Sequence, residues 1–101
     1  MRRAVPSSTT VSDERLAALA KALGHPARVR IVRLLGERAS CVTGEIAPEL
    51  GLAPSTVSEH LRILREAGLI NTVASDGRPC YCISSDGLRS LTGAIERLAC
   101  R

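Results

Sequence analysis

The sequence predicts a mainly α-helical domain with one small β-hairpin near its C-terminal end. Five segments place apolar residues at helical spacing between capping residues and glycines. One stretch, residues 69–84, alternates about an Asp-Gly turn as a hairpin does. The length of 101 residues indicates a single domain, and its core must be aliphatic because Phe and Trp are absent. A core this thin is often supplemented by oligomerisation.

We expect residues 1–10 to form a flexible tail and residues 11–101 to form the folded domain. No run of about 18 apolar residues is present, so no membrane span is predicted. The N-terminal segment lacks the apolar stretch of a signal peptide, and we expect a cytoplasmic protein. In that compartment the four cysteines are expected to be thiols, metal ligands or redox sensors rather than structural disulfides.

The first helix is predicted to follow an N-cap at Ser12 and to end at Gly24. Its apolar stripe consists of Leu16, Leu19, Ala20 and Leu23.

A second helix is predicted from His25-Pro26 to Gly36, with Pro26 at the first helical position and His25 as a cap or packing residue. The expected inward side chains are Ala27, Ile31, Leu34 and Leu35. Its arginines are expected to face mostly outward.

A short third helix is predicted before Gly51, with Thr43 as its cap and with Ile46 and Leu50 buried. Pro48 is an awkward residue within such a helix. Only two residues then separate Gly51 from Pro54, where the most strongly periodic helix begins; it ends at Gly68. Two helices joined by so short a turn form a helix-turn-helix.

The hairpin, with strands at 69–74 and 79–84, follows this pair directly, in the position of a wing. The predicted fold is therefore a winged helix-turn-helix with element order α-α-α-α-β-β-α. The last helix, within residues 84–101, carries Leu88, Leu91, Ile95 and Leu98 at the spacing of a coiled-coil seam. We expect this seam, with Leu16, Leu19 and Leu23, to form the interface of a homodimer.

The charge pattern predicts double-stranded DNA as the partner. The net charge is +4, the isoelectric point is about 9.3, and thirteen of the fourteen basic residues are Arg. Arg suits planar hydrogen bonding to phosphate and guanine, although codon usage in a GC-rich genome also explains the preference for Arg over Lys.

The fourth helix presents short hydroxyl side chains near its N-terminus, the end that enters the major groove in such motifs. These are Ser55, Thr56 and Ser58. Arg62 can reach phosphate or guanine, and Glu59 either accepts from cytosine or pairs with an arginine. His60 is either a packed residue or a DNA contact. Arg78, at the wing tip, suits a phosphate or minor-groove contact or stays solvated.

The segments ALGHPARVRIVRLL and GEIAPELGLAPSTVSEHLRILREAGLI, followed by the wing, resemble the ArsR/SmtB family of bacterial winged helix-turn-helix repressors. The resemblance covers roughly residues 13–100. It implies a homodimer that occupies operator DNA until an inducer, usually a metal or metalloid, releases it.

Three cysteines suggest what the inducer is. Cys80 and Cys82 are two apart in a predicted strand and so share a face, with Cβ atoms about 6.8 Å apart. A disulfide needs about 3.8 Å, so the two thiols are poor partners for each other but can converge on one atom. In winged helices the segment before the third helix often pairs with the second wing strand, which would bring Cys41 beside them. Three thiolates suit As(III) or Sb(III) as the inducer.

The resemblance also limits this interpretation. Many arsenic-responsive members carry Cys-x-Cys before the third helix, whereas this chain has Cys41-Val42-Thr43. The family's zinc or cobalt site on the last helix needs histidines, which are missing here. Cys100 is an alternative ligand or an inert thiol, and the trio itself could simply fill gaps in the packing.

Other functions compete with metalloid sensing. A thiol redox or persulfide sensor of the same fold is the alternative. A thiol enzyme of the arsenate-reductase kind is excluded, because no Cys-x5-Arg loop is present. A zinc knot of all four cysteines lacks the usual paired spacing.

Overall fold

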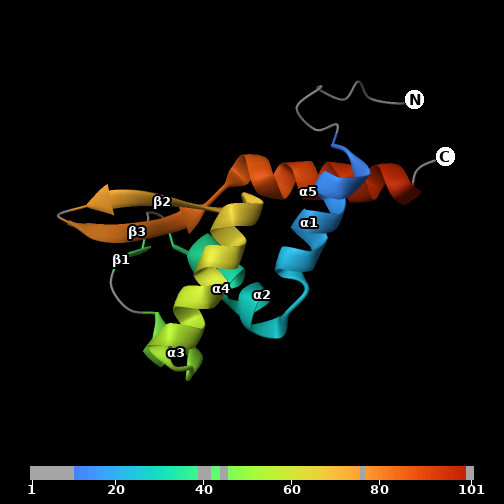
Figure 1. The fold of residues 1–101 in the computed structure, drawn as a ribbon. Coiled ribbons are helices and arrows are strands. Elements are labelled where there is room, and N and C mark those ends of the chain that lie inside the picture. The colour runs from blue at the N-terminus through green and yellow to red at the C-terminus, as the bar shows by residue number, and fades with distance from the viewer. Residues whose placement is uncertain (1–10, 39–41, 44–45, 76, 100–101) are drawn as a thin grey trace.

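Figure 1 shows a computed structural model of the chain, which describes residues 11–38, 42–43, 46–75 and 77–99. Its elements in chain order are α1 (Asp13–Leu23), α2 (Pro26–Gly36), β1 (Val42–Thr43), α3 (Ala47–Leu50), α4 (Pro54–Ala67), β2 (Ile70–Ser75), β3 (Arg78–Ile83) and α5 (Ser85–Ala99). The predicted fold class is confirmed, with a hairpin wing directly after α4. The short strand β1 is an addition to the predicted element order.

The starts of α1 and α2 follow the predicted caps. The Ser12 hydroxyl accepts from the Arg15 amide at 3.0 Å, and Nδ1 of His25 accepts from the Ala27 amide at 3.0 Å. His25 is therefore the N-cap of α2, and Pro26 occupies its first turn. One prediction for α1 is wrong: Ala20 is exposed, and Ala22 is buried beside Leu19.

The third helix is shorter than predicted. Thr43 belongs to strand β1 rather than capping a helix, and α3 begins only at Ala47. Pro48 then lies in the first turn, where its missing N–H group costs no helical hydrogen bond. The guanidinium of Arg30, from α2, donates to the Leu50 carbonyl at 3.0 Å and so holds the end of α3.

The sheet has the order β1-β3-β2, and both pairings are antiparallel. The segment before α3 pairs with the second wing strand, as expected, with Val42 opposite Tyr81 and Thr43 opposite Cys80. Tyr81 and Ile83 pack against the hydrophobic core. Because neighbours in a strand alternate between faces, Cys80 and Cys82 project from the other face.

The core is aliphatic and lies between the helices and the root of the wing. Its most deeply buried side chains are Leu19, Ile31, Leu64, Leu69 and Ile70. Leu91, from α5, also belongs to this core. Leu19 and Leu91 therefore pack inside the protomer, and the prediction that they form a dimer surface is wrong.

Candidate nucleic-acid interface and thiol pair

The core fixes which face of α4 is free for recognition. Val57, Leu61 and Leu64 are buried, and they anchor α4 against α1 and α2. The turn before α4 uses Gly51 in the left-handed conformation, with φ of 69°, which is costly for residues with a side chain. The N-cap, Ala53, makes no side-chain hydrogen bond, so no side chain at this position competes for the first-turn amides.

The predicted DNA-reading residues of α4 lie on its exposed side. Ser55, Thr56, Ser58, Glu59 and Arg62 are all exposed. Arg78 is also exposed, at the first position of β3 beside the wing turn. This geometry is compatible with the predicted DNA contacts, which remain predictions.

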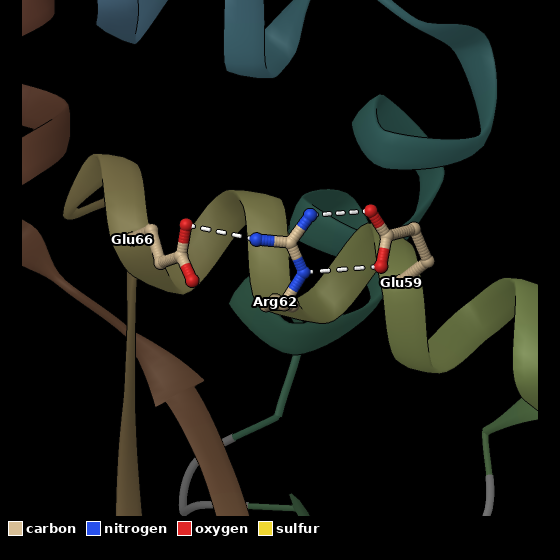
Figure 2. A network of polar contacts seen from close by, with 3 residues as sticks. All are labelled: Glu59, Arg62 and Glu66. Atoms are coloured by element: carbon tan, nitrogen blue, oxygen red, sulfur yellow. Dashed lines mark hydrogen bonds and ion pairs between the residues drawn. The ribbon is translucent and has the colours of Figure 1, made fainter.

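Arg62 lies between two carboxylates on this exposed face (Figure 2). Its Nε donates to Oε1 of Glu59 at 3.0 Å, and its Nη2 donates to the other oxygen of the same carboxylate. Its Nη1 donates to Oε1 of Glu66 at 2.9 Å. The hydrogen bond from Arg62 lowers the pKa of Glu59, and the two carboxylates raise the pKa of Arg62.

Pairing of Glu59 with an arginine was one of the two predicted roles for that residue. The contact of Arg62 with Glu66 was not predicted. Its signal is present in the sequence, because residues four apart on a helix are neighbours on its surface.

His60 is a packed residue on the inner edge of α4. Its ring lies 4.7 Å from that of His25, centroid to centroid, at an interplanar angle of 53°. Nδ1 of His60 and Nε of Arg28 are both buried without a hydrogen-bond partner in the described structure. Burial lowers the pKa of His60, and the nearby His25 and Arg28 lower it further, while Glu59 opposes this. No local pattern in the sequence announces this contact between α2 and α4.

Cys80 is buried and Cys82 is half-buried on β3, and no disulfide joins them. Cys80 lies opposite Val73 on β2 and Thr43 on β1, whereas Cys82 lies opposite Asn71. The structure thus places two soft donors on one face of the sheet. Cys41 and Cys100 lie outside the described residues, so the predicted trio stays a prediction.

Within residues 11–38, 42–43, 46–75 and 77–99, no three His, Cys, Asp or Glu side chains gather as metal ligands would. The predicted trio includes Cys41, which is not among them. None of the helices in the same ranges is long and apolar enough to cross a membrane.

Residues 25–72 match the model of the bacterial regulatory protein, arsR family. They span α2 to the first part of the wing. Over 89 residues the chain is 32% identical to the HTH-type transcriptional regulator YgaV of Escherichia coli, covering 88% of this chain and 90% of YgaV. The chain belongs to the arsR family.

Solved structures agree with this assignment. HlyU of Vibrio cholerae superimposes with a TM-score of 0.67 at 29% identity, over 87% of this chain and 95% of HlyU. A domain of Mb0332 from Mycobacterium bovis, described as a homodimeric winged helix-turn-helix DNA-binding domain, has a TM-score of 0.65. The match covers 89% of this chain and 88% of that domain at 24% identity. At this identity the likeness concerns the fold alone.

Its family makes the protein a transcriptional regulator that binds DNA rather than an enzyme. Its relatives differ in whether they activate or repress transcription. HlyU, 32% identical over 83 residues, is named a transcriptional activator, whereas a relative from Agrobacterium fabrum, 32% identical over 85 residues, is named a repressor.

Proposed function

We propose that the protein is a dimeric repressor that leaves its operator when a trivalent metalloid, As(III) or Sb(III), binds to Cys41, Cys80 and Cys82. The observation that carries the proposal is the pairing of β1 with β3. Thr43 lies opposite Cys80, and Cys41 is two residues before Thr43 in the sequence. Soft thiolates are the donors that suit such a centre.

The donor set also fits on chemical grounds. Cys80 and Cys82 share one face of β3, and the strand rise separates their Cβ atoms by about 6.8 Å. That distance disfavours a disulfide but allows both sulfurs to bind a single atom between them. Because Cys80 is buried, small thiols in solution would compete less well for a metalloid bound to it.

Release of the protein from its operator would follow from the positions of the three cysteines in the fold. β1 leads into α3 and α4, whereas β3 contacts α2 as well as both other strands. A centre that ties Cys41 to β3 would pull on the chain entering the helix-turn-helix and tilt α4. A dimeric reader depends on the spacing of its two half-sites, so a small tilt weakens DNA binding. The effector must prefer the DNA-incompetent state, and coupling of about 1–3 kcal/mol is typical.

The dimer proposal rests on the far end of α5. Leu98 is 72% exposed and Ile95 is 49% exposed. Both continue the apolar side of a helix whose Leu91 and Ala94 are buried in the protomer. Figure 1 shows this end of α5 extending past α1. A second copy of the chain would cover it.

Release from operator DNA tests the proposal directly. An operator selected from a random duplex pool is labelled, and its release is followed by fluorescence anisotropy against arsenite, antimonite, cadmium and zinc. Cys41→Ser and Cys82→Ser should bind DNA normally and respond to arsenite only at much higher concentration. Cys100→Ser is the matched control and should respond as the wild type does. A Cys80→Ser, Cys82→Ser double variant released at the wild-type arsenite concentration would overturn the proposal.

The second candidate is thiol redox sensing by the same residues. One solved structure of HlyU, 29% identical to this chain, is described as reduced HlyU. Here peroxide would take one hydrogen from the Cys41 thiol and one from the Cys80 or Cys82 thiol, forming water and a disulfide between them, whereas a polysulfide would leave an added sulfur atom on these thiols. Intact mass spectrometry separates the candidates: bound arsenic favours the metalloid, and a mass loss of two hydrogens after peroxide treatment favours the redox bridge.

A further inference from the structure

One group of side chains on the exposed face of α4 carries a net negative charge, which is unexpected on a surface that we propose binds DNA. Glu59, Arg62 and Glu66 lie together on it (Figure 2), and their formal charges sum to −1. All three side chains are exposed, at 56%, 45% and 58%. Phosphates repel carboxylates, so this triplet weakens the attraction that gives most DNA binding its strength.

The geometry shows what the carboxylates do to Arg62. Its Nε and Nη2 form one two-donor edge, and both bond to Glu59. Its Nη1 bonds to Glu66. Paired donor edges of this kind form the bidentate contacts of Arg with phosphate or guanine. Arg62 therefore cannot offer its Nε–Nη2 edge to DNA without giving up Glu59.

We propose that Glu59 and Glu66 are specificity-determining residues, which withhold Arg62 from unrelated DNA and let it go only at the operator. This inference rests on the proposed DNA-reading role of α4. At a random sequence Arg62 would exchange two carboxylates for a single phosphate. At the operator, a base-edge contact in the correct register replaces the lost hydrogen bonds. The two carboxylates thus lower random binding more than operator binding.

Neutral isosteres test this role. Glu59→Gln, Glu66→Gln and the double variant keep the side-chain size and remove the charge. Affinity is measured by fluorescence anisotropy for the selected operator and for a scrambled duplex of the same length, from 50 to 200 mM salt. We expect scrambled DNA to bind the double variant more tightly at low salt, with a smaller gain for the operator.

The salt dependence gives a second readout. If the freed Arg62 adds one phosphate contact to scrambled DNA, the salt slope steepens by about 0.9. Scrambled DNA should then lose about 3.5-fold more affinity across this salt range than it does with the wild type. Glu14→Gln, at an exposed position of α1, changes the net charge by one unit, as each single variant does, and should leave the ratio of operator to scrambled affinity unchanged.

Repeating the substitutions in an Arg62→Ala background decides between the proposed role and plain repulsion. If the carboxylates act by holding Arg62, the effect of Glu59→Gln and Glu66→Gln on the affinity ratio disappears there. An effect of the same size in that background, or a ratio that never changes, overturns the inference while the repressor proposal stands. A wild type with no preference for any sequence overturns the DNA-reading proposal and this inference with it.

Discussion

At the scale of single residues, we predict that His60, which is half-buried, makes the stability of the protein sensitive to acid. Its ring packs on His25, and its Nδ1 is buried without a partner within the described structure. Burial first, and then His25 and Arg28, lower the pKa of His60, while Glu59 acts in the opposite direction. A protonated His60 would bring a further positive charge beside Arg28. The folded state therefore favours the neutral imidazole.

The sign of the pH effect follows from this shift. An unfolded histidine titrates near pH 6.5, and folded His60 titrates lower, so the unfolded chain takes up the proton first. The stability that His60 contributes is fully present above about pH 6.5 and is lost as pH falls through the folded pKa. We predict that His60→Gln loses less of its free energy of unfolding than the wild type between pH 7.5 and 5.5.

Urea denaturation at those two pH values measures the difference. His25→Asn is a useful companion variant, because Asn keeps an N-cap acceptor for α2 and removes the neighbouring imidazole. Equal losses for the wild type and His60→Gln would show that His60 does not carry the acid sensitivity.

At the scale of elements, Gly87 lets α5 pack on the end of α4. A Cβ at this position would lie 1.9 Å from the carbonyl oxygen of Gly68 and 2.9 Å from its carbonyl carbon. Both contacts are with backbone, so the helices would have to move apart. The Gly87 amide also donates to the Ser84 hydroxyl at 3.1 Å, at the start of α5. This joint links the C-terminus of α4 to the helix that we propose for dimerisation.

We predict that Gly87→Ala destabilises the fold by about 1–3 kcal/mol, the usual cost of overpacking. Helix propensity alone predicts the opposite sign, because Ala exceeds Gly by about 1 kcal/mol inside a helix. Thermal and urea unfolding will distinguish the two effects. Gly77→Ala is the companion variant: its φ of 75° makes it strained, but its Cβ would meet nothing within 4 Å. An increase in the stability of Gly87→Ala would contradict the close contact.

The element boundaries that the sequence predicts correctly are those set by local chemistry. Ser12 and His25 cap their helices with their own side chains, and Gly51 and Gly68 end theirs with positive φ. The predicted role of Thr43 as a helix cap is wrong because a threonine can either cap a helix or extend a strand. Here pairing with β3, which is distant in the sequence, places Thr43 in a strand. Its choice depends on sheet pairing, which no local pattern contains.

The residues of the candidate site also fall into two groups: those that a local pattern predicts and those whose contacts depend on the tertiary fold. The exposed face of α4 follows from helical periodicity alone, so its residues were predictable. Packing of His60 on His25 joins α2 to α4 and could not be predicted, since neither residue has a local signal for the other. The sequence predicts Leu19 and Leu91 at a dimer surface because an apolar stripe does not reveal whether its own chain or a partner covers it.

At the scale of the whole molecule, α5 is buried in the protomer along part of its apolar side and exposes the rest of that side near its C-terminus. Gly87, Leu91 and Ala94 of α5 are buried inside the protomer, and the same apolar side then reaches Leu98, which is 72% exposed. A winged helix that reads two half-sites needs a partner to set the distance between its reading helices. The exposed end of α5 is where we propose that this partner binds.

We predict that Leu98→Glu converts the protein from a dimer to a monomer at micromolar concentration without unfolding it. Burial of a leucine side chain contributes about 1.5–3 kcal/mol, so its loss alone weakens the dimer about tenfold or more, and a buried carboxylate adds to that cost. Because Leu98 is mostly exposed in the protomer, the helical circular dichroism should not change. Sedimentation velocity over a concentration series gives the dimer dissociation constant. Arg89→Gln is the matched control, since it changes the net charge by the same unit from the opposite side of α5. A wild type that sediments as a monomer throughout, or a Leu98→Glu variant that dimerises as the wild type does, would place the dimer interface elsewhere.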